Sequence, residues 1–262
     1  MKNINEYVDT KNIKSLQDFC IHYSWDNFFK KENVPNALEY VFEQLKVYET
    51  DETYKMSPKT VAAALNIFTK DLSNAKVIVV GMDPYPTLDV VENSRAFEVS
   101  GLESWDTPFR QHSLKNIIRV IYSSYYCDMS NNQKIPKFKE IVQLDRENVI
   151  SLIPPNEIFD YWEKQGAFFI NRFFTCDIDT RAGSHRNIWR GFSNLFFSYL
   201  LETNRDTIWF LWGNDAEKIK NLTNQKRTIY ISNHPRLYST KNDNAFLKTS
   251  CFKDTKDIIN WL

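Results

Sequence analysis

The stretch that decides the fold is residues 76–86, which read Lys76-Val77-Ile78-Val79-Val80-Gly81-Met82-Asp83-Pro84-Tyr85-Pro86. It opens with a short apolar run, and similar runs follow at 167–170 (AFFI), 207–212 (TIWFLW) and 228–232 (TIYIS). None of them alternates cleanly between apolar and polar side chains. Each is apolar on both faces, as the strands of a parallel sheet covered by helices are. We therefore expect these runs to form a parallel sheet.

Helical periodicity fills the intervals between the runs. One helical face carries Leu114, Ile117, Ile118 and Ile121, and another carries Ile188, Phe192, Leu195, Phe196 and Tyr199, with Ser184 ahead of it as an expected cap. Strands that alternate with helices favour a doubly wound arrangement. The prediction is a single α/β domain over residues 1–262, with a central, mostly parallel four-stranded sheet between two layers of helices.

Two regions lie outside this alternation. Residues 1–75 read as a helical N-terminal part, with Ser57-Pro58 as a helix start because Ser caps helices and Pro suits their first turn. Residues 127–157 are polar and interrupted by prolines, and we interpret them as an insertion with one short helix around Phe138–Leu144.

Composition narrows the class of protein. Of 262 residues 42% are hydrophobic, which suits a packed core and argues against disorder. The polar N-terminus argues against a signal peptide, and the lack of a long apolar run argues against a membrane span. We therefore expect a cytoplasmic protein that does not contact a membrane. The 4 cysteines lie far apart, which favours free thiols over a zinc site or disulfides. The net charge of zero gives no support for a nucleic-acid partner, so any such binding needs a local patch.

Polar residues follow the predicted strands. Asp83 comes after the first run, Asn171 after the second, Asn214 after the third and His234 after the fourth. Taken singly, each is explained by turn formation or by hydrogen bonding to loop backbone. Ligands of open α/β sheets bind beyond the carboxyl ends of the strands, so a carboxylate, an amide and an imidazole are expected at one edge of the sheet. The P-loop, dinucleotide, serine-hydrolase and zinc-protease motifs are absent from the sequence.

At these positions the sequence resembles the main family of uracil-DNA glycosylases, typified by a G-Q-D-P-Y-H motif. The resemblance covers roughly residues 20–262, and its motifs occur in the family's order. The matching stretches are 81–86 (GMDPYP), 95–100 (RAFEVS, similar to G-L-C-F-S-V), 113–117 (SLKNI, similar to S-L-x-N-I), 165–171 (QGAFFIN, similar to Q-G-V-L-L-L-N), 184–192 (S-H-x-x-x-W-x-x-F), 210–213 (FLWG, similar to F-L-L-W-G) and 234–239 (HPRLYS, similar to H-P-S-P-L-S).

Three positions depart from the family pattern. Met82 replaces the usual Gln, Pro86 replaces the usual His, and Arg236 stands where a phosphate-contacting Ser is usual. The D-P-Y-P variant also occurs in poxviral members, so it is compatible with activity. A guanidinium at Arg236 can bind phosphate in place of the hydroxyl.

The resemblance implies roles for these residues. Asp83 would stabilise the cationic sugar and orient water, and His234 would donate a hydrogen bond to uracil O2. Substrate contacts would come from Asn171, which would read the base, Tyr85, which would exclude the thymine methyl, Phe97, which would stack on the base, and Met82 beside it. DNA contacts would come from Ser113, Arg236 and Ser239 at phosphates, while Tyr238 or Leu237 would fill the gap left by the flipped base.

The implied function is excision of uracil from single- or double-stranded DNA, with no metal and no cofactor, by a monomer that a proteinaceous glycosylase inhibitor could bind. Two alternatives stay open. One is a catalytically weak DNA-binding relative that acts as a replication or repair partner, and the other is a glycosylase with a different base preference. The substitutions at Met82 and Pro86 and the insertion motivate the first of these.

Overall fold

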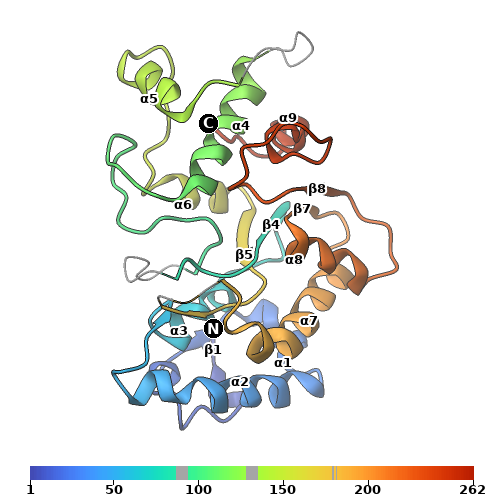
Figure 1. Ribbon diagram of the computed structural model, residues 1–262. Coiled ribbons are helices and arrows are strands. Elements are labelled where there is room, and N and C mark those ends of the chain that lie inside the picture. The colour runs from blue at the N-terminus through green and yellow to red at the C-terminus, as the bar shows by residue number, and fades with distance from the viewer. Residues whose placement is uncertain (87–93, 128–134, 179, 181) are drawn as a thin grey trace.

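Four parallel strands form the centre of the molecule (Figure 1). The computed structural model describes all residues of the chain except 87–93, 128–134, 179 and 181. The strands are β4 (Val77–Gly81), β5 (Ala167–Asn171), β7 (Ile208–Trp212) and β8 (Ile229–Ser232). Their order across the sheet is β5-β4-β7-β8, and all neighbouring pairs are parallel. Each predicted apolar run is a strand to within one residue, which confirms the expected sheet.

The chain reverses its winding direction at β4. From β4 it crosses to β5 on one side, then returns to build β7 and β8 on the other side. A crevice forms at such a switch point because the connections leave the central strands in opposite directions. The carboxyl ends of β4 and β5 lie level there, since Gly81 pairs with Asn171.

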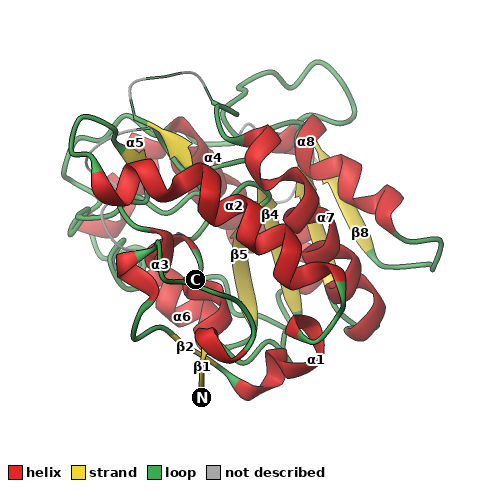
Figure 2. Ribbon diagram, turned by 90° about the horizontal axis from the view of Figure 1, so that it is seen from below, coloured by secondary structure: helices red, strands yellow, loops and turns green. Residues whose placement is uncertain are grey.

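Helices cover both faces of the sheet. Their bounds are α1 (Asp26–Phe29), α2 (Asn33–Thr50), α3 (Val61–Ala64), α4 (His112–Tyr126), α5 (Phe138–Arg146), α6 (Ile158–Lys164), α7 (Arg186–Thr203), α8 (Asn214–Glu217) and α9 (Cys251–Thr255). In Figure 1, α4, α5, α6 and α9 lie above the sheet and α1, α2, α3 and α7 below it. Figure 2 shows α2 and α7 lying across the strands. The three-layer architecture is therefore as predicted.

Alternating side chains of each strand pack into two separate hydrophobic cores, one on each face of the sheet. Ile78 and Val80 of β4 pack into the core between the sheet and helices α2 and α7. Val77 and Val79 pack into the core between the sheet and helices α4 and α6. Successive strand residues point to opposite faces, and burial of both faces is what makes the run continuously apolar. Both faces of β4 and β5 are consequently dry, and polar chemistry begins only where the strands end.

The N-terminal part differs from the expectation in its details. It contains short strands as well as helices: β1 (Lys2–Asn3) pairs with β2 (Cys20–Ile21), and β3 (Met56–Ser57) pairs with β6 (Cys176–Asp177). The predicted helix start at Ser57-Pro58 was wrong. Ser57 is engaged in β3, and the helix begins after Thr60, whose side chain accepts a hydrogen bond from the Ala63 N–H. The cap therefore lies nearer to the helix than the Ser-Pro pair.

Two further predictions concern helix ends and the insertion. Ser184 does not cap α7, because its hydroxyl instead accepts a hydrogen bond from the Asp177 N–H. The short helix predicted around Phe138–Leu144 is α5, while residues 128–134 of the proposed insertion lie outside the described residues. Within the described part of the chain, no helix is long and apolar enough to cross a membrane. That residues 1–262 form a single domain stays a prediction.

Candidate active site

A cavity of about 710 Å³ opens at the carboxyl ends of the parallel strands. Asp83 after β4, Asn171 at the end of β5 and His234 after β8 all line it, so three strands bring their polar residues to one place. The cavity walls also include Met82, Tyr85, Phe97, Ser113, Arg236 and Leu237. Nearly all of the sequence-predicted site residues therefore meet in one cavity.

Asp83 is held by backbone from a distant part of the chain. The Gly183 N–H donates a hydrogen bond of 2.5 Å to its Oδ2. Burial raises the pKa of Asp83 from 3.8 to about 6, while the Gly183 hydrogen bond and the charge of Arg186 lower it. The carboxylate is thus charged at neutral pH but poorly solvated, which suits a group that must stabilise a nearby positive charge.

The loop that presents Gly183 is fixed by hydrogen bonds around His185, which is buried. Ser184 accepts from the Asp177 N–H, and His185 links Thr175 through Nδ1 at 2.8 Å to Asp177 through Nε2 at 3.0 Å. The Asp177 carboxylate can only accept, so His185 Nε2–H donates to it. Nδ1 of the neutral ring is then an acceptor, and the Thr175 hydroxyl, which accepts from the Trp189 indole N–H, donates to it. Sequence reasoning missed Gly183, although the adjacent Ser184-His185 motif was the signal for it.

Asn171 is placed by a hydrogen bond and by the close approach of Gly81, which has no side chain. Its Nδ2 donates to the Ser94 carbonyl at 3.2 Å, and its side chain is buried. A Cβ built on Gly81 would lie 2.7 Å from Asn171 Oδ1 and 2.8 Å from the Ala96 Cβ. Only glycine lets the end of β4 approach the amide this closely. One Nδ2 hydrogen and Oδ1 remain for a ligand, which is a donor and an acceptor side by side.

Phe97 forms an aromatic wall of the cavity in an unusual backbone conformation. Its φ is 67°, in the left-handed region that non-glycine residues seldom adopt. Its ring lies 5.4 Å from that of Trp212 and 5.8 Å from that of His234, measured between centroids. Outliers of this kind cluster at functional sites, where surrounding contacts hold them. The ring is therefore oriented beside the imidazole and can stack on a planar ligand.

Tyr85 and Met82 complete the wall next to Asp83. The Tyr85 hydroxyl is buried, makes no hydrogen bond with the described residues, and has its pKa raised by burial. Met82 Sδ lies 3.7 Å from Nη2 of Arg186, so a guanidinium borders the position where the family pattern has Gln. Arg186 in turn pairs with Asp215 at 2.7 Å. The cavity is thus largely apolar near Tyr85 and polar near Arg186.

His234 is neutral and has a defined tautomer. Burial, with a further contribution from Arg236, lowers its pKa to about 4. Its Nδ1 accepts a hydrogen bond of 3.2 Å from the Arg236 N–H, so in the neutral ring the proton is on Nε2. Gly213, at φ +93°, makes room for the ring, because a Cβ there would lie 3.2 Å from the His234 Cβ. The imidazole is therefore a neutral hydrogen-bond donor.

The predicted DNA-contacting residues divide into two groups. Ser113 is buried in the first turn of α4, and Arg236 and Leu237 line the cavity while remaining exposed to solvent. Tyr238 and Ser239 are exposed and lie outside the cavity walls. The Tyr238 hydroxyl instead contacts Nδ1 of His112 at the start of α4. Of the two candidates for filling a gap in DNA, only Leu237 borders the cavity.

The S-L-K-N-I motif anchors the loop after His234. Asn116 of α4 donates from Nδ2 to the Pro235 carbonyl at 2.6 Å, and Arg119 donates to Asn116 Oδ1 at 2.9 Å. Asn116 is fully buried, so this connection between α4 and the loop is shielded from water. Its role was not predicted, although the motif that contains it was. Among the described residues no cluster of three or more His, Cys, Asp or Glu side chains could hold a metal ion.

Comparisons with known proteins agree with this geometry. No protein-family model matches the sequence. The chain is 30% identical over 167 residues to a uracil-DNA glycosylase of Francisella tularensis subsp. novicida, a match that covers 63% of this chain and 62% of that protein, less than two thirds of its length. The structure is similar to the UNG from Nitratifractor salsuginis, with a TM-score of 0.65 at 17% identity over 91% of this chain and 92% of the other. It is also similar to a variant of mimivirus UNG in complex with UGI, with a TM-score of 0.62 at 24% identity over 86% of this chain and 73% of the other. The chain therefore has the fold of these proteins.

Proposed function

We propose that this protein excises uracil from DNA by hydrolysing the N-glycosidic bond, as a uracil-DNA glycosylase of the D-P-Y-P variant of its family. The observation that carries the proposal is the meeting of Asp83, Asn171 and neutral His234 in one cavity beside Phe97. A carboxylate, a base-reading amide and an imidazole donor are the groups that this reaction needs. The similarity to a uracil-DNA glycosylase and the shared fold support it.

Asp83 stabilises the sugar in this mechanism. A base inside a duplex is out of reach, so the target nucleotide is first flipped into the cavity. Cleavage of the bond between C1′ and N1 leaves positive charge on the sugar. The poorly solvated carboxylate stabilises this charge strongly. Asp83 also orients the water that adds to C1′. The hydrogen bond from Gly183 fixes the carboxylate for both tasks.

His234 stabilises the departing base. The electron pair of the broken bond moves into uracil, and negative charge develops on O2. A neutral imidazole donates its Nε2–H to that oxygen, and its low pKa of about 4 keeps it from carrying a charge at neutral pH. Water supplies the hydroxyl that completes the sugar, and the proton that this water loses neutralises the uracil anion, so the products are free uracil and an abasic site. The side chains and one water molecule account for the whole reaction.

Base selectivity follows from three side chains. The Oδ1 of Asn171 accepts from uracil N3–H and its Nδ2 donates to O4, whereas cytosine presents the opposite pattern and would leave these buried groups unpaired. Tyr85 fills the space beside C5 and excludes the thymine methyl group. Phe97 stacks on the base, a contact worth about 1–3 kcal/mol in proteins that bind single strands.

The DNA backbone is held by residues at the mouth of the cavity. Ser113 and Ser239 contact phosphates through their hydroxyls, and Arg236 does so through its guanidinium. Leu237 fills the space that the flipped base leaves, since it borders the cavity. These contacts supply the local DNA-binding patch that the balanced net charge does not reveal.

A protein inhibitor is a further expected partner. A mimivirus protein of the same fold was solved in complex with UGI, which supports an equivalent inhibitor complex for this chain. Location in the cytoplasm and a monomeric state remain predictions from the sequence.

The test is release of uracil from a uracil-containing oligonucleotide, followed by alkaline cleavage of abasic sites. We expect strand scission by the wild type, and its near loss in Asp83→Asn and His234→Ala. Tight DNA binding without scission would contradict the proposal and favour a non-catalytic partner role. Release of thymine or hypoxanthine, but not of uracil, would favour a glycosylase of different base preference.

A further inference from the structure

A buried ion pair brackets the residue that is proposed to stack on the base. Arg95 and Glu98 lie on either side of Ala96-Phe97, and the guanidinium meets the carboxylate through two parallel hydrogen bonds, Nε to Oε2 at 2.9 Å and Nη2 to Oε1 at 2.8 Å. Their side chains are 13% and 8% exposed. Both residues also line the cavity. The family motif G-L-C-F-S-V carries neither charge, so the pair is a departure of this chain.

The pair closes a turn whose central residue has an unusual backbone conformation. Phe97 adopts the left-handed φ of 67°, a conformation that costs on the order of 1–3 kcal/mol for such a residue and needs support from its surroundings. Before Phe97, backbone contacts with β5 also hold the turn. The Ala96 N–H donates to the Phe169 carbonyl at 3.2 Å, and the backbone of Arg95 forms an antiparallel β-bridge with Ile170. Beyond Phe97, the Glu98 carboxylate ties the turn back to Arg95.

The same segment also orients the base-reading amide. Asn171 Nδ2 donates to the carbonyl of Ser94, the residue immediately before Arg95. This bond decides which way round the amide lies, and therefore where its Oδ1 acceptor faces. A shift of the segment containing residues 94–98 would thus move the stacking ring and the amide partner together.

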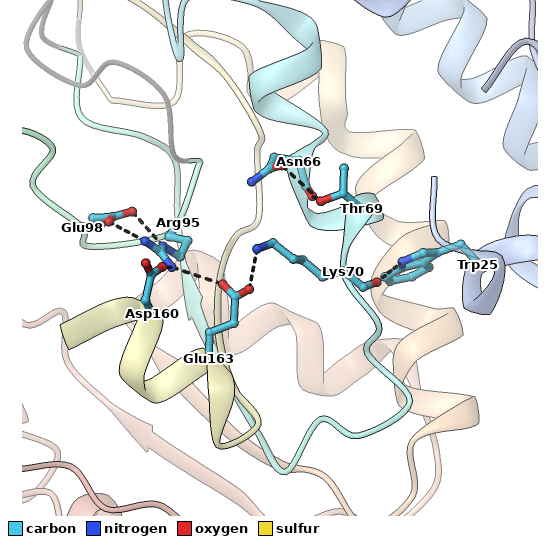
Figure 3. A network of polar contacts seen from close by, with 8 residues as sticks. All are labelled: Trp25, Asn66, Thr69, Lys70, Arg95, Glu98, Asp160 and Glu163. Carbon is cyan, nitrogen blue, oxygen red and sulfur yellow. Dashed lines mark hydrogen bonds and ion pairs between the residues drawn. The ribbon is translucent and has the colours of Figure 1, made fainter. Parts of the chain in front are cut away.

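Arg95 is itself fixed by helix α6 (Figure 3). Its Nη1 donates to Asp160 at 2.5 Å and to Glu163 at 3.3 Å, and Glu163 also pairs with Lys70 at 2.7 Å. Asp160 is 60% exposed and Glu163 16%. The described cluster holds two cations and three carboxylates, so removing the charge of Glu98 leaves it balanced. A Glu98→Gln variant is therefore expected to fold.

We propose that the Arg95–Glu98 pair positions Phe97 and Asn171 for uracil, and so determines how tightly and how selectively the cavity holds the base. This inference rests on the proposed function, because it concerns the same cavity. Arg95 and Glu98 are positioning residues in it, since they act through their neighbours. The competing explanation is that the cluster only attaches α6 to the edge of the sheet.

The two explanations differ at Asp160. Asp160→Asn removes one carboxylate from Arg95, as Glu98→Gln does, but it leaves the turn around Phe97 closed. It serves as the matched control. Arg95→Lys keeps the positive charge and loses the two parallel hydrogen bonds, because an ammonium cannot form them with fixed geometry. If the pair positions its neighbours, Arg95→Lys should lose as much uracil affinity as Glu98→Gln. If only the charge matters, Arg95→Lys should bind uracil as the wild type does.

The experiment measures binding of free uracil, which reads the base site without DNA or catalysis. The dissociation constant for uracil and the kcat and KM for a uracil-containing oligonucleotide are determined for wild type and the three variants, with thermal unfolding as the folding check. We expect Glu98→Gln and Arg95→Lys to weaken uracil binding and lower kcat about tenfold each, as displacement of aligned groups by a fraction of an ångström does. Asp160→Asn should stay within about twofold of wild type, on the scale of an exposed ion pair.

Two results would overturn the inference. One is wild-type uracil affinity in a folded Glu98→Gln variant, and the other is an equal loss in Asp160→Asn. Failure of the proposed function has a different signature, because the wild type itself would then neither bind uracil nor release it from DNA.

Discussion

The floor of the cavity and its rim are built in different ways. The floor consists of residues that follow strands of the buried sheet or pack against it, and hydrogen bonds with backbone groups or aromatic packing fix each of them: Asp83, Phe97, Asn171 and His234. The rim, residues 236–239, is exposed throughout. It is anchored at Pro235 by Asn116 and at Tyr238 by His112. The candidate catalytic groups are thus placed by a rigid scaffold, whereas the proposed DNA contacts lie on a surface loop.

The largest effect is expected on the floor. Asp83→Asn and His234→Ala should each lower kcat for uracil release by about a hundredfold or more, because each removes a group aimed at charge that develops in the transition state. KM should change little. Single-turnover kinetics on a uracil-containing oligonucleotide measure this. Equal losses of kcat in variants of the rim would contradict the assignment of the chemistry to the floor.

Removal of the base-reading amide should have the next largest effect. Asn171→Ala leaves uracil N3–H and O4 without partners in a buried site, which lowers kcat/KM by about a hundredfold. Affinity for an oligonucleotide with an abasic site should remain near the wild-type value, since that product lacks the base. A parallel loss of abasic-site affinity would show that Asn171 supports the fold of the cavity rather than reads the base.

Asp83 should also lower the stability of the folded protein at neutral pH. Its pKa is raised from 3.8 to about 6 on folding, so the native state binds the proton more tightly than the unfolded chain, and stability falls as pH rises between these values. Asp83→Asn should therefore increase the free energy of unfolding by about 3 kcal/mol at pH 8 and by less than about 1 kcal/mol at pH 4. Urea unfolding at the two pH values checks this. An Asn variant no more stable than wild type at pH 8 would contradict the buried-carboxylate interpretation.

The same carboxyl group should set the acid limb of activity. Below about pH 6 Asp83 becomes protonated and kcat/KM should fall about tenfold per pH unit, whereas His234 stays neutral down to about pH 4 and adds no limb above it. Arg186→Gln removes a charge that lowers the pKa of Asp83, so its limb should shift to higher pH. A limb that is unmoved in Arg186→Gln would argue that another group titrates.

The smallest effects are expected at the rim. Tyr238→Phe removes only the contact of the hydroxyl with His112 and should change kcat/KM by less than about threefold, since exposed contacts contribute little. Leu237→Ala should lower kcat/KM more on duplex than on single-stranded DNA, because only a duplex has a gap to fill. If Tyr238→Ala shows that duplex-specific loss and Leu237→Ala does not, Tyr238 is the gap-filling residue.

The sheet and the floor were predictable because burial leaves a plain mark on the sequence. A strand covered on both faces must be apolar throughout, so β4 and β5 were found to within a residue, and Asp83 and Asn171 followed from where the apolar runs stop. The expectation at Ser57-Pro58 failed because the local sequence is ambiguous and a distant strand resolves it. A Ser-Pro pair is compatible with a helix start and with the end of a strand, and pairing with β6 decides between them.

The supporting contacts could not be predicted, because they join residues far apart in the chain. Gly183 reaches Asp83 across 100 residues, and Asp160 reaches Arg95 across 65. No periodicity relates such positions. Nothing in the sequence indicates that the charged Arg95 and Glu98 are buried, and only the fold shows it.

Gly81 has a consequence for how this chain can change. The amide of Asn171 and the Cβ of Ala96 lie so close to Gly81 that one additional carbon atom there would come within 3 Å of both. Even alanine at that position would displace the base-reading amide and the residue that precedes the stacking ring. Selection should therefore tolerate almost no substitution at residue 81, although it takes part in no step of the reaction, and a saturation library screened for uracil release should return glycine there almost alone.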